Sequence, residues 1–180
     1  SKQRIETDCE IFLKCGGCQF RHIDYSDELK IKEELLRIEL NWQEKLEIVS
    51  SSPVGYRNNV QLKYSDNKFG FYKIASNELV PFPSEGCNNL QPELNEFIRT
   101  ENKKFRGKEI KLRFDTNRMI EYSKNETSHS INNYSFKVPP NGFFQINRFL
   151  IEIWINKIIS LLPDKKENIL ELFSGCGLIS

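Results

Sequence analysis

The sequence predicts an α+β protein, with a small antiparallel sheet and flanking helices followed by the first helix and strand of a doubly wound α/β unit. Short strand-like runs occupy its middle. Segments with helical spacing lie on both sides of these runs, and near the end a short apolar run leads into a glycine loop. A cysteine-rich loop precedes all of these elements and is expected to hold a metal cluster.

The first helix is predicted within "DYSDELKIKEELLRIELNW", residues 24–42. Acidic residues fill its first turn, and Ile31, Leu35, Ile38 and Trp42 follow the spacing of one helix face. This pattern is typical of an amphipathic helix.

The sheet is predicted from the segment "NNVQLKYSDNKFGFYK", in which Val60, Leu62 and Tyr64 alternate with polar residues before a turn at 65–67. The chain then resumes its strand pattern at Phe69 and Phe71, as expected of a hairpin. Further strands are predicted at 109–114, 119–122 and 135–138, and a short helix begins near Pro92 in "QPELNEFIRT".

The last forty residues have a different character. "NRFLIEIWINKIISLLPD" predicts a buried helix that stops at Pro163. "NILELFSGCG" then predicts a strand at 168–173 that enters a glycine loop, which is the opening of a doubly wound sheet. One parallel strand needs neighbours, so we expect this chain to be a fragment that lacks most of a C-terminal α/β domain. The absence of an initiator Met suggests a cut at the N-terminus as well.

Composition and charge limit the function classes. Hydrophobic residues make up 38% of the 180, and no apolar run approaches the roughly 18 residues of a membrane span. No signal-peptide pattern opens the chain, so a cytoplasmic protein is expected. The net charge of +1 is too small for the protein as a whole to attract nucleic acid electrostatically. Any contact with nucleic acid must therefore come from a local patch. The candidate is the basic run of Lys103, Lys104, Arg106, Lys108, Lys111, Arg113 and Arg118, although a solvated face is the commoner meaning of such a run.

The cysteines are the strongest chemical signal. Cys15 and Cys18 are separated by two glycines, Cys9 lies six positions before Cys15, and Cys87 is the candidate fourth ligand. Three near thiols and one distant thiol suit an iron–sulfur cubane, in which each iron binds one thiolate. Zinc is an alternative, in which His22 completes a site with Cys9, Cys15 and Cys18. Buried unliganded cysteines or a redox pair are the less specific explanations.

"PNGFFQIN" combines two aromatic rings with the amides of Gln145 and Asn147, although a Phe pair more often packs in a core. A lone G-x-G in the glycine loop is weak evidence for a nucleotide-like ligand. His129, in a polar stretch, is expected to be exposed, and Cys176 is interpreted as an ordinary loop residue.

Taken in order, C-x5-C-G-G-C with a distant Cys, "YRNNVQLKY", "GFFQIN" and "ILELFSGCG" resemble the RNA (uracil-5-)-methyltransferase family, in particular its iron–sulfur branch that modifies ribosomal RNA. The resemblance covers nearly the whole chain. It departs from the family at Glu171, where Asp is common, and in the S-G-C-G order of the loop.

The resemblance implies a function and a set of site residues. S-adenosylmethionine is the expected cofactor, with contacts from Gln145, Phe173 and Leu178 near Gly175 and Gly177, and Phe143 is expected near the target nucleotide. A 4Fe-4S cluster is expected on Cys9, Cys15, Cys18 and Cys87. The implied domains are a cluster loop at 1–24, a central α+β domain at 25–140 and the start of a methyltransferase domain at 141–180.

In the family's chemistry a Cys thiolate adds to C6 of uracil, C5 takes the methyl group, a base removes the C5 proton, and the Cys then leaves C6. The family places that Cys and the basic Glu further downstream, so no catalytic residue is assigned and these 180 residues alone are expected to be inactive. The expected partner is RNA, ribosomal more than transfer RNA, with no membrane, and the protein is expected to be a monomer. The alternative function is a metal-clamped RNA-binding module without methyl transfer.

Overall fold

The computed structural model describes residues 4–101, 105, 107–163, 168 and 170–179. Its helices are α1 (Tyr25–Glu39), α2 (Pro92–Glu101) and α3 (Ile151–Ser160). The strands are β1 (Asn59–Ser65), β2 (Lys68–Tyr72), β3 (Leu79–Pro81), β4 (Glu109–Phe114), β5 (Met119–Glu121), β6 (Thr127–Ile131) and β7 (Tyr134–Val138). Within these residues no helix is both long enough and apolar enough to cross a bilayer.

The main sheet has the strand order β3-β2-β1-β4-β5, and every neighbouring pair is antiparallel. The predicted hairpin is confirmed as β1–β2, in which Ser65 pairs with Lys68. The two residues of its turn, Asp66 and Asn67, adopt φ of 51° and 60°. Asp and Asn tolerate this left-handed conformation better than most residues, which explains why the chain reverses here.

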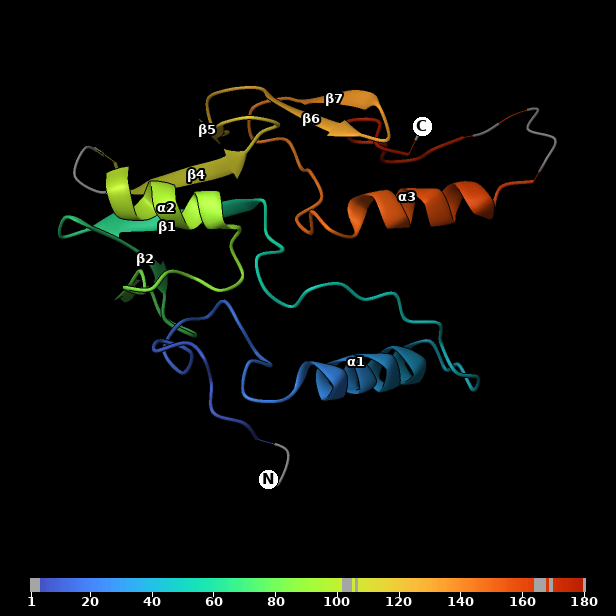
Figure 1. Ribbon diagram of the computed structural model, residues 1–180, viewed down its shortest axis with the longest axis horizontal. Helices are drawn as coiled ribbons and strands as arrows, with labels where there is room; N and C mark the ends of the chain where they lie inside the picture. The colour runs from blue at the N-terminus through green and yellow to red at the C-terminus, as the bar shows by residue number, and fades with distance from the viewer. Residues whose placement is uncertain (1–3, 102–104, 106, 164–167, 169, 180) are drawn as a thin grey trace.

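The first hydrophobic core lies between the sheet and α2. Leu62 and Leu112 from the sheet meet Leu94 and Ile98 from α2, and each of these side chains is at most 1% exposed. Burying a side chain of this size stabilises a fold by about 1.5–3 kcal/mol. This packing fixes α2 on the sheet and thereby fixes the loop that precedes the helix (Figure 1).

A second core joins the β6–β7 hairpin to α3, and Figure 1 shows these elements side by side at the C-terminal end of the chain. Its buried residues are Ile131, Val138, Phe144, Ile151 and Ile155. The predicted burial of α3 is only partly confirmed, because Trp154 and Ile159, at the margins of the predicted apolar face, are 39% and 48% exposed.

Helix α1 forms where the sequence predicted a helix, but it lies apart from the sheet (Figure 1). It contains no buried residue, and Leu35 and Ile38 on its predicted apolar face are 56% and 70% exposed. The periodicity therefore predicted the helix correctly without predicting what covers it. A segment without helix or strand, residues 40–58, connects α1 to β1.

The strand predicted at 168–173 is not formed by the described residues of that range. A parallel strand gains its hydrogen bonds only from neighbouring strands, and the described chain supplies no such strand there.

Strands β3 and β6 were not predicted from the sequence, since β3 has three residues and β6 has the polar sequence Thr-Ser-His-Ser-Ile. Lys103, Lys104 and Arg106 of the predicted basic run lie outside the described residues.

Candidate functional site

The cysteine-rich loop is closed on itself and attached to the sheet. Arg4 forms a bridge with Ile23, and the Ile5 amide donates to the His22 carbonyl at 2.9 Å. Near Cys15 the Gly16 amide donates to the Tyr72 carbonyl at 3.1 Å, at the end of β2. Backbone hydrogen bonds thus hold the loop at the sheet edge.

Cys87 reaches the same region from the loop before α2. The Asn95 side chain, in the first turns of α2, accepts from the Cys87 amide at 2.8 Å and donates to its carbonyl at 3.1 Å. Gly86 before it has φ of 94°, and a Cβ there would lie 2.8 Å from Asn95 Oδ1. Only glycine fits this turn, so α2 and Gly86 together place Cys87.

All four predicted ligands are free, half-buried thiols. Burial raises the pKa of the Cys15, Cys18 and Cys87 thiols, and the neighbouring charge of Cys9 raises each of them further. Polar groups partly offset this, because Asn89 Nδ2 donates to Cys18 Sγ at 3.1 Å and the Gly17 amide to Cys15 Sγ at 3.4 Å. The fold therefore gathers thiols that a cation would stabilise as thiolates.

Across the described part of the chain, no three His, Cys, Asp or Glu side chains are arranged to hold one metal ion. A single zinc would require its sulfurs roughly 3.8 Å apart, given a Zn–S bond of about 2.3 Å in tetrahedral geometry. A cubane places its thiolates farther apart, because each binds a different iron. The described residues show no single-ion site, and the cluster on these cysteines stays a prediction.

His22, the alternative zinc ligand, packs against Phe12 with ring centroids 5.5 Å apart. Its Nδ1 is buried without a hydrogen-bond partner among the described atoms.

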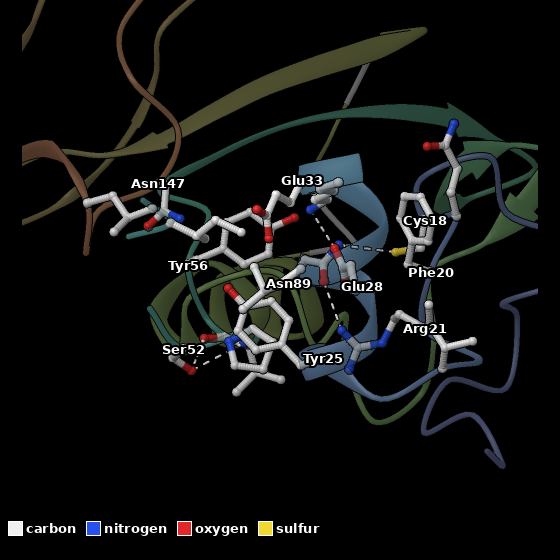
Figure 2. Close-up of a pocket in the computed structure, with 18 of the residues that line it drawn as sticks. Cys18, Phe20, Arg21, Tyr25, Glu28, Glu33, Ser52, Tyr56, Asn89 and Asn147 are labelled. Carbon is white, nitrogen blue, oxygen red and sulfur yellow. Dashed lines mark hydrogen bonds and ion pairs between the residues drawn. The ribbon is translucent and has the colours of Figure 1, made fainter. Parts of the chain in front are cut away.

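A charged network borders the cysteine site. Arg21 forms an ion pair with Asp8 and donates from Nη1 to Asn89 Oδ1 at 2.9 Å. Burial alone would lower the pKa of Arg21, but the Asp8 carboxylate raises it above its ordinary value, and Arg21 in turn lowers the pKa of Asp8. Figure 2 shows Asn89 between Cys18 and Arg21, at the wall of a pocket of about 880 Å³ that α1 also lines.

The loop Gly142–Asn147, which carries the F-F-Q-x-N motif, exposes one of its two Phe rings and buries the other. Phe143 is 69% exposed, whereas Phe144 is 2% exposed and stacks on His129 with ring centroids 4.0 Å apart. Gly142 is required for steric reasons, because a Cβ there would lie 2.8 Å from the Pro139 carbonyl oxygen. The loop thus offers an exposed aromatic ring, which the half-buried Gln145 follows two positions later.

The prediction that His129 is exposed was wrong, since it is 8% exposed beneath Phe144. Strand alternation places Thr127, His129 and Ile131 on the inner face of β6, which overrides the polar character of the segment. Burial, reinforced by the charge of Arg113, lowers the pKa of His129 to about 4.

Arg113, from the predicted basic run, is 2% exposed and does not belong to a solvated patch. It donates from Nη1 to Thr127 Oγ1 at 3.1 Å and from Nη2 to the Gly142 carbonyl at 2.9 Å, and it lies over the Tyr122 ring at 4.3 Å. Burial lowers its pKa. Arg113 therefore supports the start of the motif loop from inside the fold.

Gln145 and Asn147 line a mostly apolar pocket of about 440 Å³ at the start of α3. Its other lining residues are Val49, Leu150, Ile151, Ile153, Trp154 and Lys157. The glycine loop does not contribute to this lining.

The glycine loop itself turns through residues of positive φ, namely Phe173 at 61°, Gly175 at 61° and Gly177 at 73°. Phe173 is fully exposed, whereas Cys176 and Leu178 pack against the second core that contains Phe144. The structure thus brings the glycine loop to the inner side of the motif loop, and it does not bring its predicted cofactor residues into one pocket with Gln145.

Asn58, which sequence inspection did not single out, holds the motif loop from the other side. Its Nδ2 donates to the Gln145 carbonyl at 2.9 Å and its amide to the Ile146 carbonyl at 3.1 Å. Asn58 is 5% exposed. The pair of asparagines in "YRNN" was the only sequence signal, and it did not distinguish a buried clamp from a turn.

No family model matches the chain. An uncharacterized RNA methyltransferase of Leptospira interrogans is 38% identical over 100% of this chain and 50% of its own length. Another, from Clostridium tetani, is 25% identical over 100% of this chain and 55% of its own length.

The tRNA (uracil(54)-C(5))-methyltransferase of Pyrococcus abyssi is 24% identical over 98% of this chain and 57% of its own length. The crystal structure of that organism's tRNA (uracil-54, C5)-methyltransferase in complex with S-adenosyl-L-homocysteine matches 99% of this chain and 56% of its own, with a TM-score of 0.68 at 20% identity. At that identity the likeness establishes the fold alone. The chain spans about half the length of the relatives it matches.

Proposed function

We propose that this chain, which the comparisons relate to the RNA uracil-C5 methyltransferases, is part of an S-adenosylmethionine-dependent enzyme that methylates C5 of uridine in RNA. One observation carries the proposal. The motif loop holds its backbone and Phe144 inside the fold while it presents Phe143 outward and Gln145 at the edge of a pocket. An exposed ring can stack on a base, and an amide beside it can hydrogen-bond a cofactor, so the arrangement suits both ligands.

The residues of this chain have separate parts in that function. The Gln145 amide can donate to and accept from the polar groups of S-adenosylmethionine, and the backbone of the glycine loop at Phe173, Gly175, Gly177 and Leu178 can approach the cofactor closely. S-adenosylmethionine, when bound, supplies the methyl group. The exposed Phe143 ring offers a stacking surface for a uracil that has left its base stack.

The cysteine site is proposed to hold a 4Fe-4S cluster on Cys9, Cys15, Cys18 and Cys87. Support comes from the spacing of the four cysteines and from the neighbouring charges that raise the pKa of the half-buried Cys15, Cys18 and Cys87 thiols after burial itself. Methyl transfer involves no net redox change. The cluster is therefore proposed to order the loops around it and to position RNA, with no part in electron transfer.

Ribosomal RNA is the proposed substrate, because the cysteine spacing resembles that of the branch that modifies it. The Pyrococcus abyssi relative is named for transfer RNA, so transfer RNA is the alternative that the experiment must separate. The nucleophilic Cys and the base are expected outside these residues, as in the family, and the whole protein is needed for turnover.

The test uses the full-length protein, purified without oxygen, with S-adenosylmethionine and unmodified ribosomal or transfer RNA. Nucleoside mass spectrometry should show 5-methyluridine in ribosomal RNA. Phe143→Ala should reduce the yield at subsaturating RNA by about tenfold, since stacking contributes about 1–3 kcal/mol per base. Phe149→Ala, at another exposed ring outside the motif, is the matched control and should leave the yield unchanged. Methylation of transfer RNA alone would make transfer RNA the substrate in place of ribosomal RNA. The absence of 5-methyluridine from both RNAs would refute the proposed function.

A further inference from the structure

The segment Gly55–Asn58, called here the connecting segment, lies between the cysteine site and the motif loop. It precedes β1 and belongs to neither of the two hydrophobic cores by its side chains. Its backbone nevertheless pairs on both sides, through a parallel bridge of Arg57 with Leu90 and an antiparallel bridge of Arg57 with Asn147. Three segments that are distant in sequence are therefore joined as one ribbon.

On one side the connecting segment is attached to the loop that follows Cys87. The Gly55 amide donates to the Asn88 carbonyl at 2.8 Å and the Arg57 amide to the Asn89 carbonyl at 2.9 Å. Asn89 also donates from its side chain to Cys18 Sγ, as Figure 2 shows. One residue thus contacts a predicted cluster ligand with its side chain and the connecting segment with its backbone.

On the other side the connecting segment is attached to the motif loop. The Arg148 amide donates to the Tyr56 carbonyl at 2.9 Å, and Asn58 makes its two bonds to the carbonyls of Gln145 and Ile146. The side-chain amide of Asn58 is fixed in orientation, because Asn59 Nδ2 donates to Asn58 Oδ1 at 3.0 Å. The motif loop has no regular helix or strand of its own, so these bonds set the place of Gln145.

We propose that Asn58 is a positioning residue that transmits the order of the cysteine site to Gln145 and so sets the affinity for S-adenosylmethionine. This inference rests on the proposed function. The route is short: from Cys18 through Asn89 to Arg57, and from the adjacent Asn58 to the Gln145 carbonyl. Such a route gives the cysteine site a structural effect on cofactor binding without any electron transfer.

The first experiment replaces the amide of Asn58 by an isosteric carboxylate. Asn58→Asp removes the donor to Gln145 and should weaken S-adenosylhomocysteine binding, measured by titration calorimetry on the full-length protein, by about tenfold. Gln91→Met is the control for loss of a buried side-chain amide, because the Gln91 side chain is similarly buried and donates to Glu93, while the backbone bond from the Gln91 amide to the Arg57 carbonyl is kept. Asn58→Asp should raise KM for S-adenosylmethionine more than it lowers kcat. A general loss of folded protein would not produce this difference between the two parameters.

The second experiment tests transmission with a double-mutant cycle of Asn89→Ala and Asn58→Ala. Alone, Asn89→Ala should weaken S-adenosylhomocysteine binding several-fold and speed hydrogen exchange at the Arg148 amide. In the Asn58→Ala background it should add nothing to either quantity. Iron content and circular dichroism of each variant show whether the fold persists, and Asn58→Asp replaces Asn58→Ala in the cycle if the latter does not fold.

The outcomes separate the two proposals. If the unaltered protein binds no S-adenosylhomocysteine, the proposed function fails and this inference falls with it. If it binds normally and Asn58→Asp behaves as Gln91→Met does, only the positioning role of Asn58 is refuted. Additive effects in the cycle would refute transmission from the cysteine site.

Discussion

His129 is held between the Phe144 ring and the charge of Arg113, with less than a tenth of its surface exposed. Desolvation is the largest cause of its lowered pKa of about 4, Arg113 lowers it further, and Asp115 partly opposes the shift. A charged imidazole at this place would be unfavourable. The ring therefore acts as a flat, neutral support for the motif loop.

This burial predicts a pH-dependent stability. Between pH 6.5 and 4 the unfolded chain binds a proton at His129 that the folded chain does not, so stability falls as pH falls through this window. At pH 5 the loss should be about 2 kcal/mol relative to pH 7. Urea unfolding at the two pH values should show it. His129→Phe, which keeps a ring against Phe144, should remove most of the difference, and an unchanged difference would contradict the assigned pKa.

Cys87 offers the sharpest test of the predicted ligand set. Cys87→Ala should strip or destabilise the cluster, measured as iron and sulfide in protein purified without oxygen. Cys176→Ala is the matched control, because Cys176 packs against the second core and was not assigned to the set. Full iron and sulfide in Cys87→Ala would remove Cys87 from the ligands.

Single residues differ in how far the sequence reveals them. The sequence predicts a role for the cysteines from their spacing and for Gln145 from the family resemblance of its motif, and both stay predictions. It does not predict the roles of Asn58, Arg113 and His129, because their importance comes from burial beside residues that are distant in sequence. A polar side chain inside a strand or loop has no local mark that distinguishes a buried clamp from a solvated surface.

At the scale of elements, α2 is held by its apolar face rather than by its ends. Leu94 and Ile98 are fully buried against β1 and β4, and the same helix supplies Asn95 to hold Cys87. Packing of α2 in the first core therefore determines where the fourth cysteine lies.

Leu94→Ala should lower the free energy of unfolding by about 2–5 kcal/mol, since it removes buried methyl groups and leaves a cavity. Leu35→Ala on α1, where the side chain is 56% exposed, should change it by about 0.5 kcal/mol or less. Denaturant unfolding of the two variants measures both values. Equal losses would mean that α1 contributes to the core as much as α2 does.

The regular elements were predicted where periodicity is strong, as in α1, α2, the β1–β2 hairpin and β4. The short β3 and the polar β6 escaped because their formation depends on partners across the sheet. The same dependence explains why the described residues of 168–173 form no strand. The predicted pattern is present there, but the described chain provides no neighbouring strand.

On the scale of the whole molecule, the connecting segment joins a cysteine site to a motif loop, and two separate cores fix the elements on either side of it. The chain spans about half the length of its relatives, so the reaction is a property proposed for the full-length protein. The parts proposed for these residues are binding and positioning: thiols for a cluster, an amide for a cofactor and an exposed ring for a base.

The most direct measurement of this account is the nucleoside content of RNA from the native host with and without the gene. Mass spectrometry of separated ribosomal and transfer RNA should show 5-methyluridine at one ribosomal position in the parent strain and its absence in the deletion strain, with recovery when the gene is restored. Identical 5-methyluridine in both strains, in every RNA fraction, would contradict the account.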